Sequence, residues 1–274
     1  MQLIAVNTAG KRVAAAHAEK KIDYHCPECQ SPLRLRQGSH VQAHFYHYRQ
    51  TTRCPHRNKS LAHLSNQLYL SEQLPHGEAI LEHSFPAIRR IADVYWPAQR
   101  IVFEIQCSPM TRAEAEERER DYASLGMRLV WILHEARYNK RRLTAVEDFF
   151  VSRHTYFTSI RKVGSGVIYD QFDIIRNGRR CFKGAKFPLQ PDQPYQLQGS
   201  PSSATYPRTL LQRWETRTLG FAGDLLDVAN RKTNYDYSSL LALENRFAKK
   251  KRPFLKTFAA VYRAFLYALL EKFC

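Results

Sequence analysis

Two acidic residues and a glutamine could together form a centre for cutting phosphodiester bonds. Asp93 lies in one apolar stretch, and Glu104 and Gln106 lie in a second stretch that follows a turn-like segment at 97–100. The pattern predicts a β-hairpin, in which Glu104 and Gln106 share a face and Asp93 can lie opposite them. Mg²⁺ takes oxygen ligands, usually one or two carboxylates, and leaves room for water and phosphate. Because charged residues are mostly exposed, two solvated acids on an open sheet face are the alternative.

The segments around this hairpin predict the elements that would position it. Leucines on one side of residues 60–74 indicate a helix, and Thr111 and Glu114 have the spacing of a capping box at the start of a second helix that ends at Leu125 before Gly126. An almost continuous apolar run at 128–133 is typical of a strand buried on both faces. The expected order is a helix at 60–74, strands at 79–85, 89–95 and 101–107, a helix at 111–125 and a strand at 128–133.

The second helix carries an arginine on the face that should pack on the sheet. Thr111, Ala115, Arg118, Tyr122 and Leu125 follow spacings of one helix face. An inward-facing arginine needs a partner, and an active-site carboxylate or a substrate phosphate would serve, since a guanidinium binds both. The alternative is an Arg118 side chain that extends to the edge of the protein.

This order of elements, with an acid on the second strand and Glu-x-Gln on the third, resembles the PD-(D/E)XK nuclease superfamily, and within it the competence protein CoiA family. The resemblance covers residues 1–150. It is carried by the stretches 90–94, 104–108, Arg118-x3-Tyr122, 130–133, Cys26-Pro27-Glu28-Cys29 and His44-Phe45-Tyr46-His47.

The resemblance implies an α+β or α/β fold with a restriction-endonuclease-like core, and a nuclease centre in which Asp93 and Glu104 hold Mg²⁺ or Mn²⁺. Gln106 would orient a water, and Arg118 and Tyr122 would brace the site or contact phosphate. Two positions depart from the pattern. Gln106 replaces the usual lysine, although relatives resembling this chain also tend to carry glutamine. His63 on the first helix is present, but Gln67 replaces the lysine expected four residues later.

Cysteines and histidines near the amino terminus have the spacing of a structural zinc site. Cys26-x2-Cys29 precedes His44-x2-His47, and Zn²⁺ is held tetrahedrally by such ligands. Cys54 could replace one histidine, so the fourth ligand stays open. The alternative is a pair of reduced, buried cysteines beside surface histidines. A hairpin is expected within residues 1–24, and metal binding would stabilise a segment too small to fold alone.

The charge is uneven and indicates a polyanionic partner. The 274-residue chain carries a net charge of +17, of which +5 falls in residues 1–150 and +12 in 151–274. Basic clusters with interleaved aromatic residues favour DNA, single- or double-stranded. A basic surface without a specific partner is the alternative.

The organisation expected from these patterns has three parts: a β-rich zinc-binding segment at 1–57, a nuclease-like core at 58–150, and a basic, mainly helical region at 151–274. In the last part, residues 187–207 predict a loop, and 209–229, 237–250 and 254–273 predict helices. The last is too short and too charged to span a membrane. The remaining cysteines show no pairing pattern, and no export signal opens the chain, which favours a reducing cytoplasm.

Three functions agree with the sequence. The first is a metal-dependent DNA nuclease that, by the CoiA likeness, processes DNA during transformation or recombination alongside recombination or DNA-uptake proteins. The second is a DNA-binding protein of the same fold without cutting activity, which the missing lysine motivates. The third is a defence nuclease against foreign DNA.

Overall fold

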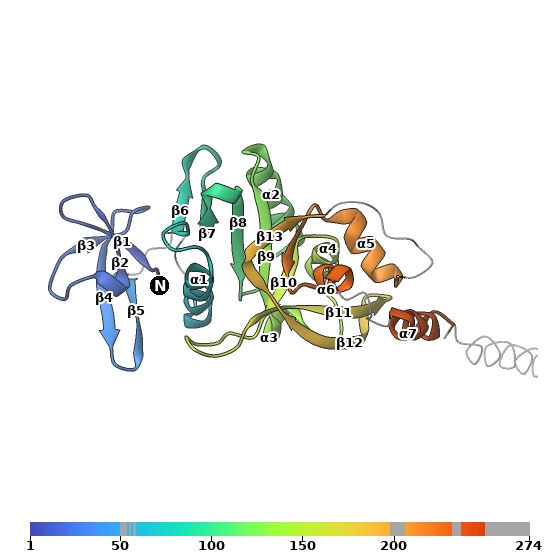
Figure 1. Ribbon diagram of the computed structural model, residues 1–274. Coiled ribbons are helices and arrows are strands. Elements are labelled where there is room, and N and C mark those ends of the chain that lie inside the picture. The colour runs from blue at the N-terminus through green and yellow to red at the C-terminus, as the bar shows by residue number, and fades with distance from the viewer. Residues whose placement is uncertain (50–53, 55, 57–58, 198–205, 232–236, 250–274) are drawn as a thin grey trace, which may run out of the picture.

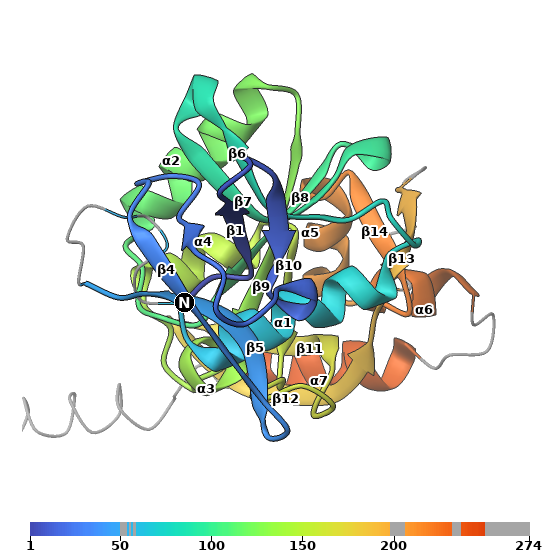
Figure 2. The same cartoon turned by 90° about the vertical axis from the view of Figure 1, so that its left-hand side faces the viewer.

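The computed structural model describes residues 1–274 except 50–53, 55, 57–58, 198–205, 232–236 and 250–274. A small β-sheet at the amino-terminal end lies beside a larger mixed sheet with helices on both of its faces (Figure 1). Figure 2 turns the small sheet toward the viewer. The described helices are too short or too polar to cross a membrane.

The small sheet is antiparallel and has the strand order β2-β1-β3-β4-β5. Its first two strands form the expected hairpin, whose turn is closed by the Asn7 side chain accepting the backbone N–H groups of Ala9 and Lys11. Tyr24, Phe45 and other apolar residues form its own core. The strands are β1 (Ile4–Asn7), β2 (Arg12–Ala14), β3 (Tyr24–His25), β4 (Pro32–Gly38) and β5 (Val41–His47).

The central sheet has seven strands in the order β12-β11-β10-β9-β8-β7-β6. Strands β8, β9 and β10 are parallel to one another, and the remaining neighbours are antiparallel. The four strands expected at 79–133 are all present. The strands are β6 (Ile80–Phe85), β7 (Arg90–Trp96), β8 (Ile101–Gln106), β9 (Arg128–His134), β10 (Thr155–Thr158), β11 (Ile168–Arg176) and β12 (Arg179–Pro188).

Helices cover the two faces of this sheet and bury separate cores. Helix α1 (Leu61–Gln73) packs with one face through Leu70, and α2 (Arg112–Ser124) packs with the other through Ala115 and Tyr122. The expected capping box forms at Thr111, and Gly126 has the left-handed φ of +67° that ends α2. Two short helices, α3 (Glu135–Tyr138) and α4 (Ala145–Val151), share the α2 face.

The described residues after 150 are not mainly helical, contrary to the expectation for this region. Strands β10 to β12 continue the central sheet, so the boundary expected at 150 falls within one sheet. The expected loop at 187–207 contains β13 (Gln190–Gln196), which pairs with β14 (Leu219–Ala222). Pro191 and Pro194 lack an N–H donor, which suits β13 to this irregular two-stranded ladder rather than to a central strand.

The helix expected at 209–229 is therefore divided into α5 (Arg208–Thr216) and α6 (Leu225–Arg231), with β14 between them. Gly220 lets β13 approach, because a Cβ there would lie 2.4 Å from a ring atom of Tyr195. The helix expected at 237–250 is α7 (Tyr237–Lys249). The helix expected at 254–273 and the side chains of the basic run 249–252 lie outside the described residues.

Candidate functional site

Strands β7 and β8 bring the two predicted acids together where their regular pairing ends. The antiparallel ladder runs from Trp96–Ile101 to Val94–Phe103 and stops one step before Asp93 and Glu104. Val94 packs in the core on the α1 side, whereas Ala92, two residues earlier, packs in the core on the α2 side. Regular alternation would place both on one face, so the alternation of side chains along β7 is interrupted between these two residues. The Asp93 carboxylate thereby turns toward β8.

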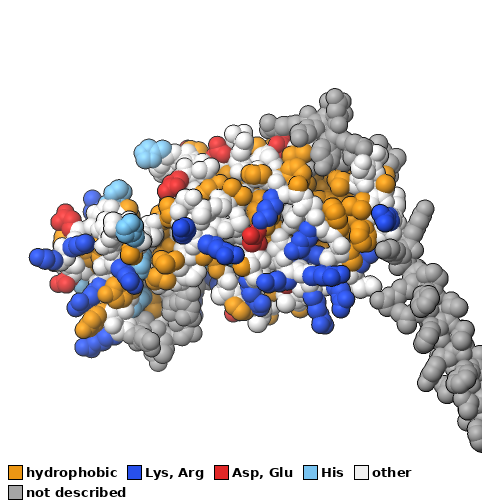
Figure 3. Space-filling model, turned by 90° about the horizontal axis from the view of Figure 1, so that it is seen from below, with side chains coloured by type: hydrophobic (Ala, Val, Ile, Leu, Met, Phe, Trp, Pro, Cys, Tyr) orange, Lys and Arg blue, Asp and Glu red, His pale blue; other side chains and the backbone are white. Residues whose placement is uncertain are grey.

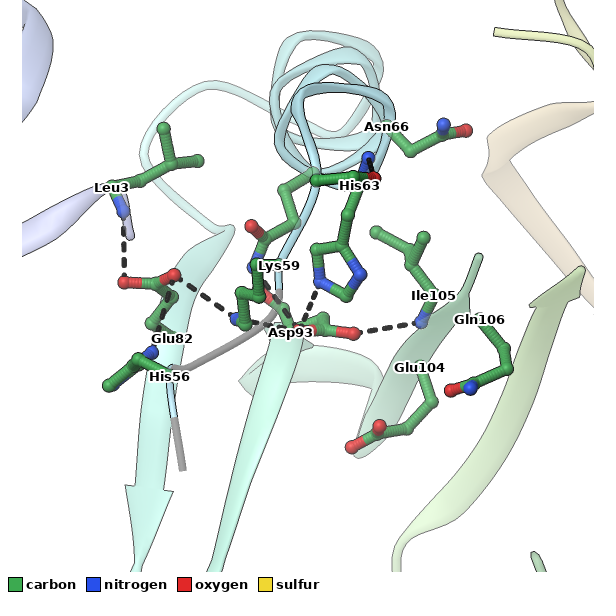
Figure 4. Close-up of polar contacts among 12 residues, drawn as sticks. Leu3, His56, Lys59, His63, Asn66, Glu82, Asp93, Glu104, Ile105 and Gln106 are labelled. Atoms are coloured by element: carbon green, nitrogen blue, oxygen red, sulfur yellow. Dashed lines mark hydrogen bonds and ion pairs between the residues drawn. The ribbon is translucent and has the colours of Figure 1, made fainter. Parts of the chain in front are cut away.

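The Asp93 carboxylate is buried and surrounded by positive charge (Figure 4). Its Oδ1 lies 2.8 Å from His63 Nε2 and 2.9 Å from Lys59 Nζ. Its Oδ2 accepts the backbone N–H of Ile105 at 2.9 Å, and Gln67 donates to the Asp93 carbonyl at 3.0 Å. Burial alone would raise the pKa of Asp93, but His63 and Lys59 outweigh it and hold that pKa well below its ordinary value.

The Glu104 carboxylate is buried on the α2 side and is held by two residues of that helix. Tyr122 donates its hydroxyl to Oε1 at 2.6 Å, and the Arg118 guanidinium donates to Oε2. Arg118 thus has the carboxylate partner that its position on the helix required. Burial raises the pKa of Glu104, and the charge of Arg118 opposes that rise only in part. Glu104 therefore binds a proton more readily than an exposed glutamate.

Asp93, Glu104 and Gln106 line one cavity of about 280 Å³. The Gln106 amide nitrogen donates to the carbonyl and hydroxyl oxygens of Ser108, which fixes the orientation of the amide. A carboxylate offers about four acceptor positions, and Asp93 Oδ2 and each oxygen of Glu104 accept from a single protein donor, so each of these oxygens can take a further ligand. This donor set and volume fit a hydrated divalent ion. Basic side chains line the same cavity: Lys59, Arg89, Arg90 and Arg118.

Two residues that the sequence patterns did not indicate, Lys59 and Glu82, complete this site. Lys59 directly precedes the Ser60 cap of α1, four positions before His63, and its ammonium bridges Asp93 and Glu82. Glu82 is fully buried on β6, where its Oε2 accepts the backbone N–H groups of Leu3 and Ile4, at 3.1 Å each. A lysine one helical turn before His63 and an acid within an apolar strand were the available signals.

Glu82 therefore joins the small sheet to the nuclease-like centre. Burial would raise its pKa, but Lys59 outweighs burial and lowers it. Arg12 on β2 adds a second link by donating to the Glu82 carbonyl at 2.9 Å. Beside Glu82, His56 is buried and lines the same cavity as Asp93, and burial lowers the pKa of His56 to about 4.

Four residues of the amino-terminal segment form a cluster with the chemistry of a zinc site. The ligand atoms of Cys26, Cys29, His47 and Cys54 all lie within 4.8 Å of one another. Cys26 and Cys54 Sγ are 3.6 Å apart, and Cys29 Sγ lies 3.2 Å from His47 Nε2. Tetrahedral Zn²⁺ with ordinary bond lengths places such atoms about 3.5 to 3.8 Å apart, so the donor set fits zinc.

His44, which the sequence analysis placed among the zinc ligands, is not in this cluster. Its Nδ1 lies 2.7 Å from the carbonyl oxygen of Gln42. His44 and His47 are three positions apart on β5, and residues separated by an odd number project to opposite faces of a strand. Only one of the two can therefore face the cysteines, and Cys54 is the fourth member of the cluster.

Two family models match the chain. The model of the competence protein CoiA N-terminal domain matches residues 8–57, and that of the competence protein CoiA nuclease-like domain matches residues 59–161. A search of curated proteins found no match, and neither did a search of solved structures. The two matched segments contain the Cys₃His cluster and the acidic centre, respectively, and together span more than half of the chain. The chain belongs to the competence protein CoiA family and carries its N-terminal and nuclease-like domains.

Proposed function

We propose that the protein is a metal-dependent DNA nuclease whose centre is the cavity lined by Asp93 of β7 and Glu104 of β8. The observation that carries this proposal is that Asp93 and Glu104, from neighbouring strands, line one cavity together with basic side chains. A polyanionic backbone needs such positive charge, and a hard cation needs the carboxylates. The arrangement of a helix, three antiparallel strands, a helix and a further strand agrees with a PD-(D/E)XK core.

Asp93 and Glu104 would hold Mg²⁺ or Mn²⁺, with Gln106 beside them. A divalent ion at this position lowers the pKa of bound water and neutralises charge on phosphate oxygens. The protein contributes the orientation of its ligands: Ile105 and His63 fix the Asp93 carboxylate, and Tyr122 fixes that of Glu104. Burial and the neighbouring carboxylate raise the pKa of Tyr122, so its hydroxyl stays protonated and donates.

Lys59 would supply the positive charge that Gln106 cannot. Its pKa is raised despite burial, because Asp93 and Glu82 stabilise the ammonium form. A fixed ammonium ion beside the metal ligands can stabilise negative charge that develops on the phosphate. Gln106, whose amide nitrogen is held by Ser108, would present its carbonyl oxygen to the attacking water.

DNA is the expected substrate, and the exposed Arg89 at the rim of the cavity is a candidate phosphate contact. The family assignment favours a role in processing DNA during transformation or recombination, with recombination or DNA-uptake proteins as partners. The Cys₃His cluster would hold one structural Zn²⁺ and stabilise the small sheet.

A cleavage assay with metal-free and metal-supplemented reactions tests this function. Wild-type protein should cut labelled DNA when Mg²⁺ or Mn²⁺ is added, and Asp93→Asn and Glu104→Gln should each lower the rate by about 100-fold or more. Glu72→Gln on the exposed side of α1 is the control and should cut normally. Wild-type activity in both centre variants would contradict the proposed centre.

The second candidate is a DNA-binding protein without cutting activity. The glutamine at position 106 favours it, as do the protein donors that already contact both oxygens of the Asp93 carboxylate. Folded wild-type protein that binds DNA but never cuts it, with either metal, would support this function instead.

A further inference from the structure

The outer face of the β4–β5 hairpin carries two exposed tyrosines among arginines. In this ladder Arg34 lies opposite Tyr46, and Leu35 lies opposite Phe45. Phe45 faces the core of the small sheet, so by strand alternation Arg34 and Tyr46 project to the outer face. Tyr46 is 38% exposed, and Tyr48, just beyond the strand, is 59% exposed.

A groove of about 700 Å³ runs beside this face. Lys20, Lys21, Ile22, Arg34 and Tyr48 are among the residues that line it. The Arg34 guanidinium lies 4.3 Å from the centroid of the Tyr48 ring, so cation and aromatic surface are presented together. Asp23 is the single carboxylate among the described residues of the lining. Figure 3 shows Lys and Arg side chains beside hydrophobic ones at this end of the molecule.

The concentration of exposed apolar surface here is unusual for this chain. Six large hydrophobic side chains are exposed among the described residues, and Ile22, Tyr46 and Tyr48 are three of them. Single exposed apolar residues need no explanation, whereas a group beside a groove marks a binding surface. The positive charges around these aromatic side chains favour a polyanionic ligand that also carries flat apolar groups.

We propose that the outer face of β4–β5 and its groove bind single-stranded nucleic acid, with bases stacked on Tyr46 and Tyr48 and phosphates held by Arg34, Lys20 and Lys21. This inference rests on the proposed function, since it names the form of DNA that the protein engages. Unpaired bases expose flat faces for stacking on aromatic side chains, whereas a duplex keeps its bases stacked inside. The surface should therefore favour single strands over duplexes.

Binding of a labelled oligothymidylate, compared with a duplex of the same length, tests the proposal by fluorescence anisotropy without added Mg²⁺ or Mn²⁺. Tyr46→Ala and Tyr48→Ala should each weaken single-strand binding by about five- to 150-fold and leave duplex binding nearly unchanged. Tyr46→Phe and Tyr48→Phe keep the ring and should bind normally. Ile80→Ala, which shortens an exposed side chain on β6, is the control and should bind like wild type.

Two further measurements distinguish a lost DNA contact from a damaged fold. Both tyrosines flank His47, so zinc content must equal that of wild type in every variant scored. Arg34→Gln should reduce the salt dependence of single-strand binding, a readout that does not need a tyrosine variant.

Unchanged single-strand affinity in folded, zinc-loaded Ala variants, or equal losses on both forms of DNA, would overturn the proposal. Equal losses would mean that the face binds both forms of DNA without preference, and unchanged affinity would mean that it does not bind single strands. Failure of the wild type to cut DNA would contradict the nuclease proposal, while this binding comparison would remain valid.

Discussion

Replacing Glu82 with glutamine should destabilise the protein, because this buried carboxylate joins the small sheet to the central one. Glu82→Gln keeps the length of the side chain and the backbone, whose φ of +50° is equally strained for either residue. It removes the negative charge that faces Lys59 at 3.1 Å. It also removes one acceptor, because an amide has a single oxygen.

The cost follows from the contacts of the two carboxylate oxygens. If the amide oxygen keeps the N–H groups of Leu3 and Ile4, the amide nitrogen points at the Lys59 ammonium, and two donors face each other. Removing one partner of a buried ion pair typically costs about 3 to 5 kcal/mol. Lys59 retains Asp93 as a partner, so we expect a smaller cost of about 2 to 3 kcal/mol.

Urea unfolding of both proteins measures this difference directly. Glu82→Gln should lower the free energy of unfolding by the stated amount, whereas Glu72→Gln on the exposed side of α1 should change it by less than about 0.5 kcal/mol. Equal stabilities for Glu82→Gln and wild type would refute the account of Glu82 as a buried link between the sheets.

Three further predictions concern the metal cluster, the centre and the response to pH. Metal analysis should find about one Zn²⁺ per chain, which Cys54→Ser loses and His44→Ala keeps; the opposite pattern would restore His44 as the ligand. Lys59→Gln should slow Mg²⁺-dependent cleavage by about 100-fold at saturating metal, and an undiminished rate would remove Lys59 from the mechanism. His154 Nε2 accepts the N–H groups of Thr218 and Leu219, and burial, reinforced by nearby arginines, lowers its pKa from 6.5 to about 3. Its stabilising contribution is therefore present above pH 6.5 and lost as the pH falls toward 3. Between about pH 7.5 and pH 5 the loss is about 2 kcal/mol, and urea unfolding of His154→Gln should lack this component.

Local patterns predicted the elements around the centre to within about one residue because each depends on short-range physics. Thr111 and Gly126 bound α2 through capping, and the apolar run at 128–133 became the buried strand β9. Arg118 was expected to face the sheet from helix periodicity alone, and it contacts Glu104 there.

The features that sequence patterns missed depend on contacts between distant segments. Glu82 meets Leu3 across 79 positions, and β13, which lies within the segment 187–207 that indicated a loop, pairs with β14. The irregularity at Asp93 that turns its carboxylate toward β8 has no local signature either. The assignment of His44 as a ligand failed for a different reason, because zinc-site spacing was applied without strand alternation.

The central claim is that Asp93 and Glu104 hold one catalytic divalent ion, and anomalous diffraction from crystals grown with Mn²⁺ tests it most directly. The account predicts a single strong peak in the cavity, within about 2.0 to 2.5 Å of an oxygen atom of each carboxylate. That peak should vanish in Glu104→Gln crystals while the Cys₃His cluster keeps its own metal. Mn²⁺ bound elsewhere, or a peak that contacts neither carboxylate, would contradict the claim.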